Sequence, residues 1–97
     1  MKIIAHLELN EGKGPGDLAA VRVDEAAVVW SLVKNNVVRA AYYRTDRLAA
    51  ILDLECPDLL SARRAMEGLL AVAAGIVRIA DLIPTAPYTG FEALFEP

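Results

Sequence analysis

The sequence has very little cysteine. Cys56 is the only cysteine among 97 residues, which excludes an internal disulfide. No other Cys or His lies near it at a spacing typical of metal ligands, so we expect no metal site, no cofactor and a reducing, cytoplasmic environment. Cys56 itself is most simply interpreted as a small apolar residue at the end of a strand.

An excess of positive charge and long hydrophobic runs are also absent. The net charge is −3, the pI is near 5.0 and the basic residues are spread along the chain, so no positive patch predicts nucleic-acid binding. No segment approaches the ~18 apolar residues of a membrane helix. The start, MKIIAHLELNEGKG, turns polar too soon for a secretory signal. We therefore expect neither a nucleic-acid partner nor a membrane partner.

Hydrophobic residues, by contrast, are abundant. They make up 56% of the chain, against about 45–50% in average globular domains. A chain of this length is one domain, residues 1–97, and a small domain buries only about 60% of the surface that its unfolded chain exposes. The surplus predicts a subunit interface, and hence a homodimer or a higher homo-oligomer.

The spacing of apolar residues predicts four strands and two helices. Lys2–Leu9 alternates with the period of a strand, whereas the Gly- and Pro-rich segment Asn10–Gly16 is typical of a flexible loop or lid. The further elements expected are a helix at Leu18–Asn35 with Asp17 as its N-cap, two strands at Val37–Arg44 and Leu48–Cys56 joined by a tight turn, a helix at Leu59–Ala74, and a strand at Ile76–Ile83.

Apolar residues at helical spacing occur in the first predicted helix and in the C-terminal tail. The stripe Val23, Ala26, Trp30 and Val33 predicts the buried face of the first helix, with Trp30 in the core. The tail at residues 84–97 carries Tyr88, Phe91, Leu94 and Phe95 at helical spacing. We expect this tail to form a short helical turn and to pack on the domain or on a partner.

The element order β-α-β-β-α-β predicts an α+β fold, the ferredoxin-like sandwich. Both helices would cover one face of an antiparallel sheet with strand order 4-1-3-2, leaving the other face bare. Two such bare faces can close on each other, and the expected assembly is a dimeric α/β barrel.

Charged residues alternate with the apolar ones that should lie under the helices. This alternation turns His6 and Glu8 of the first strand, and Asp53 and Glu55 of the third, toward the bare face. In the second strand we expect Arg39 and Tyr43 on the same face, because Val38 and Ala40 suit the helix side better.

These side chains are suited to proton transfer. Crowded, partly desolvated carboxylates have raised pKa values and histidine titrates near neutrality, so His6, Glu8, Asp53 and Glu55 are the candidate catalytic residues. Arg39 and Tyr43 are the candidate substrate-binding residues, because a guanidinium can hold a carboxylate or stabilise an enolate. The alternative is a merely hydrated face, in which cross-strand charge pairs contribute about 0.2–1 kcal/mol each.

The segments NVVRAAYYRTDRLAAILDLECPDLLSARRAMEGLL and GIVRIADLIPTAPYTGFEALF resemble the muconolactone isomerase-like proteins of the dimeric α/β-barrel superfamily. The likeness lies in an Arg–aromatic hairpin, an aliphatic strand that ends in a carboxylate and a small residue, and a closing strand that leads into a Pro–aromatic tail. The resemblance implies a ferredoxin-like subunit, barrel-forming dimers or larger rings, and cofactor-free chemistry near the sheet.

Three functions therefore remain open. The first is a cofactor-independent isomerase that moves a proton on an unsaturated lactone or oxo-acid. The second is a non-catalytic dimeric module that binds a small molecule or a protein. The third, cofactor-free oxygenation, ranks last, because it needs an aromatic pocket and aromatic residues make up only 6% of the chain.

Overall fold

The structure, a computed structural model, describes residues 1–96. Each of the four predicted strands is present, with ends that differ from the prediction by at most one residue. In chain order the elements are β1 (Lys2–Leu9), α1 (Pro15–Lys34), β2 (Val38–Tyr43), β3 (Ala49–Glu55), α2 (Leu59–Glu67), α3 (Leu70–Ala73), β4 (Val77–Pro84) and the 3-10 helix η1 (Gly90–Leu94).

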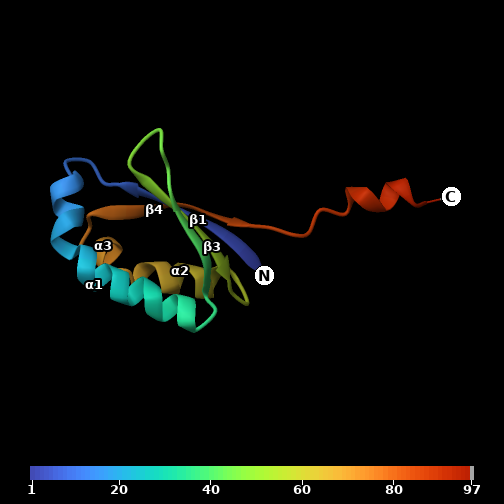
Figure 1. The fold of residues 1–97 in the computed structure, drawn as a ribbon, viewed down its shortest axis with the longest axis horizontal. Helices are drawn as coiled ribbons and strands as arrows, with labels where there is room; N and C mark the ends of the chain where they lie inside the picture. Colours follow the sequence, from blue (N-terminus) through green and yellow to red (C-terminus); the bar gives the residue numbers. More distant parts are fainter. Residues whose placement is uncertain (97) are drawn as a thin grey trace.

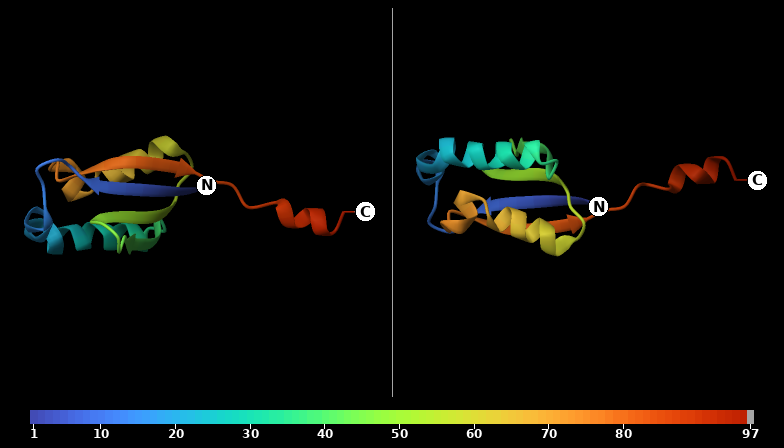
Figure 2. Two further views of the ribbon diagram at one scale, coloured as in Figure 1. Left: turned by 90° about the horizontal axis from the view of Figure 1, so that it is seen from above. Right: turned by 90° about the horizontal axis from the view of Figure 1, so that it is seen from below.

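The strands form one antiparallel sheet in the order β2-β3-β1-β4. This is the predicted order 4-1-3-2 read from the other edge. The helices lie on one face of the sheet, and the other face is open (Figure 1). Figure 2 shows α1 under the β2 side of the sheet and α2 under the β4 side. The chain is thus an α+β protein whose arrangement is compatible with the ferredoxin-like fold.

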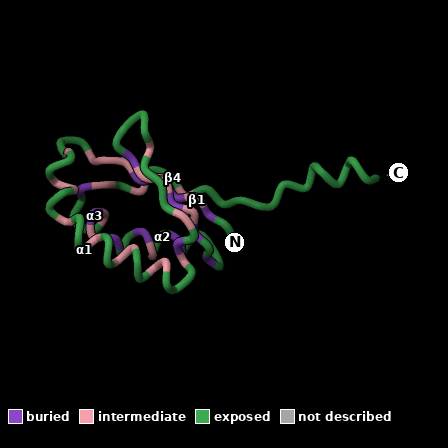
Figure 3. Tube along the Cα trace, in the orientation of Figure 1, coloured by how far each residue is buried: buried purple, intermediate pink, exposed green. Residues whose placement is uncertain are grey.

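The core lies between the sheet and α2. Alternate residues of β1, among them Ile3 and Ala5, face the helices and are fully buried, as is Leu54 of β3. They meet Ala62 and Met66 on α2, which are also fully buried. Figure 3 shows this concentration of buried residues in the central strands and α2. The period-2 alternation predicted for β1 and β3 is therefore confirmed on this face.

Helix α1 begins earlier than predicted, at Pro15 rather than Leu18. Proline suits the first turn of a helix because its missing N–H has no partner there. Asp17, predicted as the N-cap, instead lies inside the first turn, and its Oδ2 accepts a hydrogen bond of 2.9 Å from the Gly14 N–H. The loop before the helix is correspondingly shorter than expected.

The predicted buried face of α1 is wrong for most of its members. Trp30 is 60% exposed and Val23 is 76% exposed. Val33 does pack against the core, together with residues outside the predicted stripe: Val28, Val29 and Leu32. The two stripes are offset by about a third of a turn of the helix. Both faces of α1 are apolar, so periodicity alone could not decide which one turns inward.

The predicted second helix is two helices. α2 ends at Glu67 with Gly68 as its C-cap, Leu69 adopts an extended conformation, and α3 then forms a single further turn. Leu69 is buried. It lies on the same side as the buried Ala62 and Met66 of α2.

The tail does not pack on its own domain. Residues 85–96 are all exposed and lead away from the sheet, which lengthens the molecule to 58 Å along its longest axis (Figures 1 and 3). The predicted helical turn is present as η1. Packing on a partner stays a prediction, and the last predicted tail residue, Pro97, lies outside the described residues.

No helix in residues 1–96 has the length and apolar character needed to cross a membrane.

Candidate functional site

On the open face, the C-terminal end of β1 carries an ion-pair cluster centred on Glu8. Arg78 of β4 lies opposite Glu8, and its Nη2 is 2.6 Å from Glu8 Oε2. Arg47 of the hairpin turn also forms an ion pair with Glu8. His6 Nε2 is 3.6 Å from Glu8 Oε1, beyond hydrogen-bond distance. Both carboxylate oxygens of Glu8 are therefore held in ion pairs with guanidinium groups.

Asp53 and Glu55 lie at the other end of the same face. Lys2 Nζ is 3.2 Å from Asp53 Oδ2, and the amino group of Met1 is 2.7 Å from Glu55 Oε1. The hydrogen bond from this amino group lowers the pKa of Glu55, and the charge of Arg39 lowers it further. A carboxylate with a lowered pKa holds a proton less readily. The raised pKa that the catalytic prediction requires is not found at Glu55.

The four predicted catalytic residues thus share the open face but do not form one cluster. In the β1–β3 register His6 lies opposite Ile51, and Asp53 lies opposite Ile4. Neither residue bonds to the other. Among residues 1–96, the buried side-chain atoms that lack a hydrogen-bond partner are His6 Nε2 and Asp53 Oδ1. Both belong to this face, so its centre contains polar atoms without partners in a single chain.

A β-bulge in β2 changes the face of one predicted binding residue. Val38 pairs with Leu54 but Ala40 already pairs with Asp53, so Arg39 is an extra, unpaired residue. Such an insertion reverses the alternation beyond it. Tyr43 consequently pairs with Ala50 and points to the helix side, while Tyr42 pairs with Ile51 on the open face. The placement of Tyr43 on the open face is therefore wrong.

Arg39 itself is exposed at the bulge. Its Nη1 is 3.5 Å from Asn36 Oδ1, a long hydrogen bond. Its contribution to the lowered pKa of Glu55 indicates that it lies near the Glu55 end of β3. Of the four candidate catalytic residues that Arg39 was expected to accompany, it therefore lies near Glu55.

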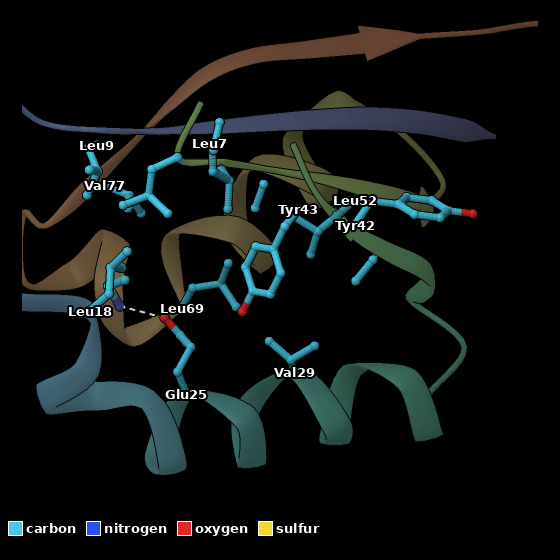
Figure 4. A pocket seen from close by; sticks show the side chains of 15 residues that line it. Leu7, Leu9, Leu18, Glu25, Val29, Tyr42, Tyr43, Leu52, Leu69 and Val77 are labelled. Carbon is cyan, nitrogen blue, oxygen red and sulfur yellow. Dashed lines mark hydrogen bonds between the residues drawn. The ribbon is translucent and has the colours of Figure 1, made fainter. Parts of the chain in front are cut away.

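The helix side of the sheet contains a cavity. A cavity of about 250 Å³ lies between α1 and the sheet (Figure 4). Its walls are almost entirely apolar and come from β1, α1, β3 and the α2–α3 region; they include Leu7, Leu9, Leu18, Val29, Leu52 and Leu69. α1, although 20 residues long, has no fully buried residue, and space is left between this helix and the sheet. α2, by contrast, packs tightly against the sheet.

Glu25 is the one charged residue in the cavity wall. Its Oε1 accepts a hydrogen bond of 2.8 Å from the Leu70 N–H, and its Oε2 accepts one of 2.7 Å from the Ala71 N–H. These bonds join the middle of α1 to the first turn of α3. They also fix the position of the carboxylate at the edge of the cavity (Figure 4).

Tyr43 supplies the second polar group. Its ring projects from β2 into the space between the sheet and α1, with the hydroxyl group directed toward α1, whereas the ring of Tyr42 points away (Figure 4). The Tyr43 side chain is 83% exposed, so a carboxylate at the edge of the cavity and a phenol at its mouth border an otherwise apolar space. This combination is typical of small-molecule sites, in which a few polar groups orient an apolar ligand.

A wider groove continues from the cavity to the surface. It has a volume of about 620 Å³ and shares with the cavity the residues Leu18, Glu25, Val29, Tyr43, Leu48 and Ala71. Its outer rim is formed by α1 and includes Arg22, Ala26 and Trp30. The cavity therefore opens between α1 and the β2–β3 hairpin.

Sequence reasoning missed Glu25, because the stripe predicted to be buried on α1 is the outer one. On the inner stripe, which contains Leu18, Val28 and Leu32, Glu25 is the only charged residue. A single carboxylate within an apolar helix face was the available signal. In the described residues, 1–96, no three His, Cys, Asp or Glu side chains gather in a way that could hold a metal ion.

The fold and the cavity define a class: a small α+β protein with a four-stranded antiparallel sheet, helices on one face, and a ligand-sized apolar cavity beneath α1. A scan against protein-family models finds no match for the chain, and a search of curated proteins finds none.

Proposed function

We propose that this chain is a cofactor-independent isomerase of the muconolactone isomerase-like kind, which moves a proton on a small unsaturated lactone or oxo-acid. The substrate binds in the cavity between α1 and the sheet. The observation that carries the proposal is the presence of a fixed carboxylate, Glu25, and a phenol at the cavity mouth, Tyr43, on the border of an apolar space of about 250 Å³.

The cavity favours occupation by a ligand. Side chains that line an empty apolar space lose van der Waals contacts on one side, and a ligand restores them. Apolar cavities of about 150 Å³ already bind molecules the size of benzene. A five- or six-membered ring with short substituents fits the volume, and this size class includes simple unsaturated lactones.

The two polar groups suit the two requirements of the reaction. The Glu25 carboxylate takes a proton from a carbon next to the substrate carbonyl, and the electron pair moves onto the carbonyl oxygen to give an enolate. The Tyr43 hydroxyl donates a hydrogen bond to that oxygen. Glu25 then returns the proton to a different carbon of the conjugated system, so the product is an isomer and no other reactant is needed.

Hydrogen exchange tests this proposal across the whole substrate class. A panel of unsaturated lactones and oxo-acids is incubated with the protein in D₂O, and deuterium incorporation next to the carbonyl is followed by NMR. The Glu25→Gln variant should lose about 10²–10⁴-fold in rate, the usual contribution of a general base. Tyr43→Phe should lose about 10²–10³-fold, the usual contribution of one oxyanion donor.

Glu67→Gln is the matched control, because Glu67 is an exposed carboxylate on α2. It should exchange substrate at the wild-type rate. Equal rates in wild type and in Glu25→Gln, with circular dichroism showing both folded, would remove Glu25 from the mechanism. No exchange with any compound would contradict the enzymatic proposal and favour a non-catalytic binding module.

A second candidate places the chemistry on the open face, between two chains that pair as a dimeric barrel. The unpartnered His6 Nε2 and Asp53 Oδ1 favour it, because buried polar atoms normally have hydrogen-bond partners. In that case His6→Ala and Asp53→Asn abolish exchange while Glu25→Gln does not. Light scattering tests the pairing itself: a monomer at micromolar concentration contradicts the dimer.

A further inference from the structure

The C-terminal tail presents four large apolar side chains that are mostly exposed. Tyr88 is 74% exposed, Phe91 65%, Leu94 75% and Phe95 85%. The tail is attached through Thr85, whose N–H and Oγ1 both contact the Lys2 carbonyl oxygen, at 3.0 and 2.8 Å. Beyond that point it extends away from the body (Figure 1). Clustered exposed apolar groups of this kind mark an interaction surface.

The tail is locally ordered before it meets anything. The rings of Tyr88 and Phe91 pack edge to face, with centroids 4.9 Å apart and an interplanar angle of 81°. A β-carbon at Gly90 would clash with the Tyr88 ring, so this packing requires glycine. A segment that is already folded loses less conformational entropy when it docks. The tail therefore has the properties of a docking element.

The groove above α1 is the complementary surface. Its rim contains Trp30, which is 60% exposed, together with Ala26 and Val33. Arg22 also lines it and forms no ion pair among the described residues, 1–96. From Thr85 onward the tail carries Glu92 and Glu96 and no basic residue. The apolar character of the rim thus matches that of the tail, and Arg22 is available to the tail glutamates, since the groove's other charged residue, Glu25, is bonded to the Leu70 and Ala71 N–H groups.

The tail of the same chain points away from this groove. β4 starts at Val77, which lines the cavity, and ends at Pro84, from which the tail departs. Eight strand residues separate the two ends by more than about 20 Å, and Figure 2 shows the tail leading away from the body rather than back over α1. This distance does not restrict the tail of a second copy of the chain.

We propose that residues Tyr88–Phe95 of one copy dock in the groove above α1 of a second copy, with the aromatic side chains against Trp30 and the glutamates beside Arg22. Reciprocal exchange gives a closed dimer with twofold symmetry. Each buried aromatic side chain contributes about 150–250 Å². Two tails with three aromatics each therefore approach the roughly 1,200–2,000 Å² of a stable interface.

The docked tail of the partner would cover the groove through which the cavity opens. The importance of this cover for ligand binding rests on the proposed function. The cavity is then complete only in the dimer. Loss of the tail contacts should expose the cavity to water and weaken ligand binding without touching Glu25 or Tyr43.

Crosslinking in the full-length chain tests the docking directly. In a Cys56→Ser background, chains with Ala26→Cys are mixed with chains with Phe95→Cys and oxidised. We expect a disulfide-linked dimer. Leu60→Cys, an exposed position on α2, replaces Ala26→Cys as the control and should not crosslink. No crosslink at Ala26, or an equal yield at Leu60, overturns the proposal, as does an internal disulfide in a monomeric chain that carries both Ala26→Cys and Phe95→Cys.

Trp30 fluorescence provides an independent measurement, because it is the only tryptophan. In a Phe91→Ala, Phe95→Ala chain its emission should shift to longer wavelength and acrylamide should quench it more than in the wild type. Unchanged emission and quenching contradict docking on Trp30.

A charge reversal tests the ionic contact. Arg22→Glu should weaken the dimer, and Glu92→Arg in the same chain should restore it. Glu25-dependent substrate exchange without crosslinking would reject the docking alone, and crosslinking without exchange would reject the enzymatic function alone.

Discussion

The two main helices lie on the same face of the sheet but pack against it very differently. α2 has nine residues, and its Ala62 and Met66 are fully buried. α1 has 20 residues and none that is fully buried. The tightly packed α2 half therefore stabilises the fold, and the α1 half leaves room for a ligand. Sites of binding and catalysis are often drawn from the less stable parts of a protein.

The largest difference between the halves should appear on truncation of a core side chain. Met66→Ala removes a fully buried side chain from the α2 half and should lower the free energy of unfolding by about 2–5 kcal/mol. Val29→Ala, in the cavity wall of the α1 half, should cost about 1 kcal/mol or less, because the side chain is only partly packed. Chemical denaturation measures both. Equal losses would contradict the contrast in packing.

A second contrast between the halves lies in the hydrogen bonds that hold α1 to the rest of the chain. Glu25→Ala leaves the N–H groups of Leu70 and Ala71 without their acceptor and should cost about 1–3 kcal/mol. Hydrogen exchange at these two amides should accelerate while exchange in β1 changes less. Glu67→Ala is the control on α2. Unaltered protection of both amides would show that the carboxylate does not fix α3.

The strand order could be predicted from the order of helices and strands along the chain. The core face of β1 and β3 could be predicted because period-2 alternation leaves one arrangement for a half-buried strand. The face of β2 could not. The extra residue at Arg39 reverses the alternation, and nothing in the residue types marks where a bulge will form. Alternation without the bulge therefore predicts Tyr43 on the open face, although it borders the cavity.

The functional face of α1 could not be predicted for a different reason. With Val, Ala and Trp on its outer side and Leu and Val on its inner side, the helix offers two apolar stripes. The choice between them depends on contacts with α3 and β2, which only the folded chain provides. The position of Glu25 at the cavity follows from that choice.

Replacing one alanine by leucine in each half tests the same contrast in packing, with smaller expected changes in stability. Ala62→Leu places extra volume in the packed α2 interface and should destabilise by about 1–3 kcal/mol. Ala50→Leu places the same volume against the cavity and should stabilise by about 0.5–2 kcal/mol, as cavity filling commonly does. The Ala50 variant should also lose ligand binding. Thermal unfolding measures the first effect, and the D₂O exchange assay the second. Destabilisation in both variants would mean that the α1 half has no usable space.

The smallest predicted effect concerns acid and the start of α2. The Ser61 N–H donates a 2.7 Å hydrogen bond to Asp58 Oδ1, and this bond lowers the pKa of Asp58 below its ordinary value of 3.8. Because the folded pKa lies below the unfolded one, the resulting stability is present above pH 3.8 and is lost as the pH falls through the lower, folded value.

Asp58→Asn keeps a capping oxygen without the charge, so the variant should lose less stability than the wild type as the pH falls from neutrality into that range. Asp24→Asn removes one negative charge from α1 and serves as the charge-matched control. Denaturation at a series of pH values tests this. Parallel curves for wild type and Asp58→Asn would mean that the cap stabilises α2 equally in both protonation states. The acid sensitivity of the packed half would then have to come from another carboxylate, of which Glu55, with its pKa lowered by the amino terminus, is the nearest on β3.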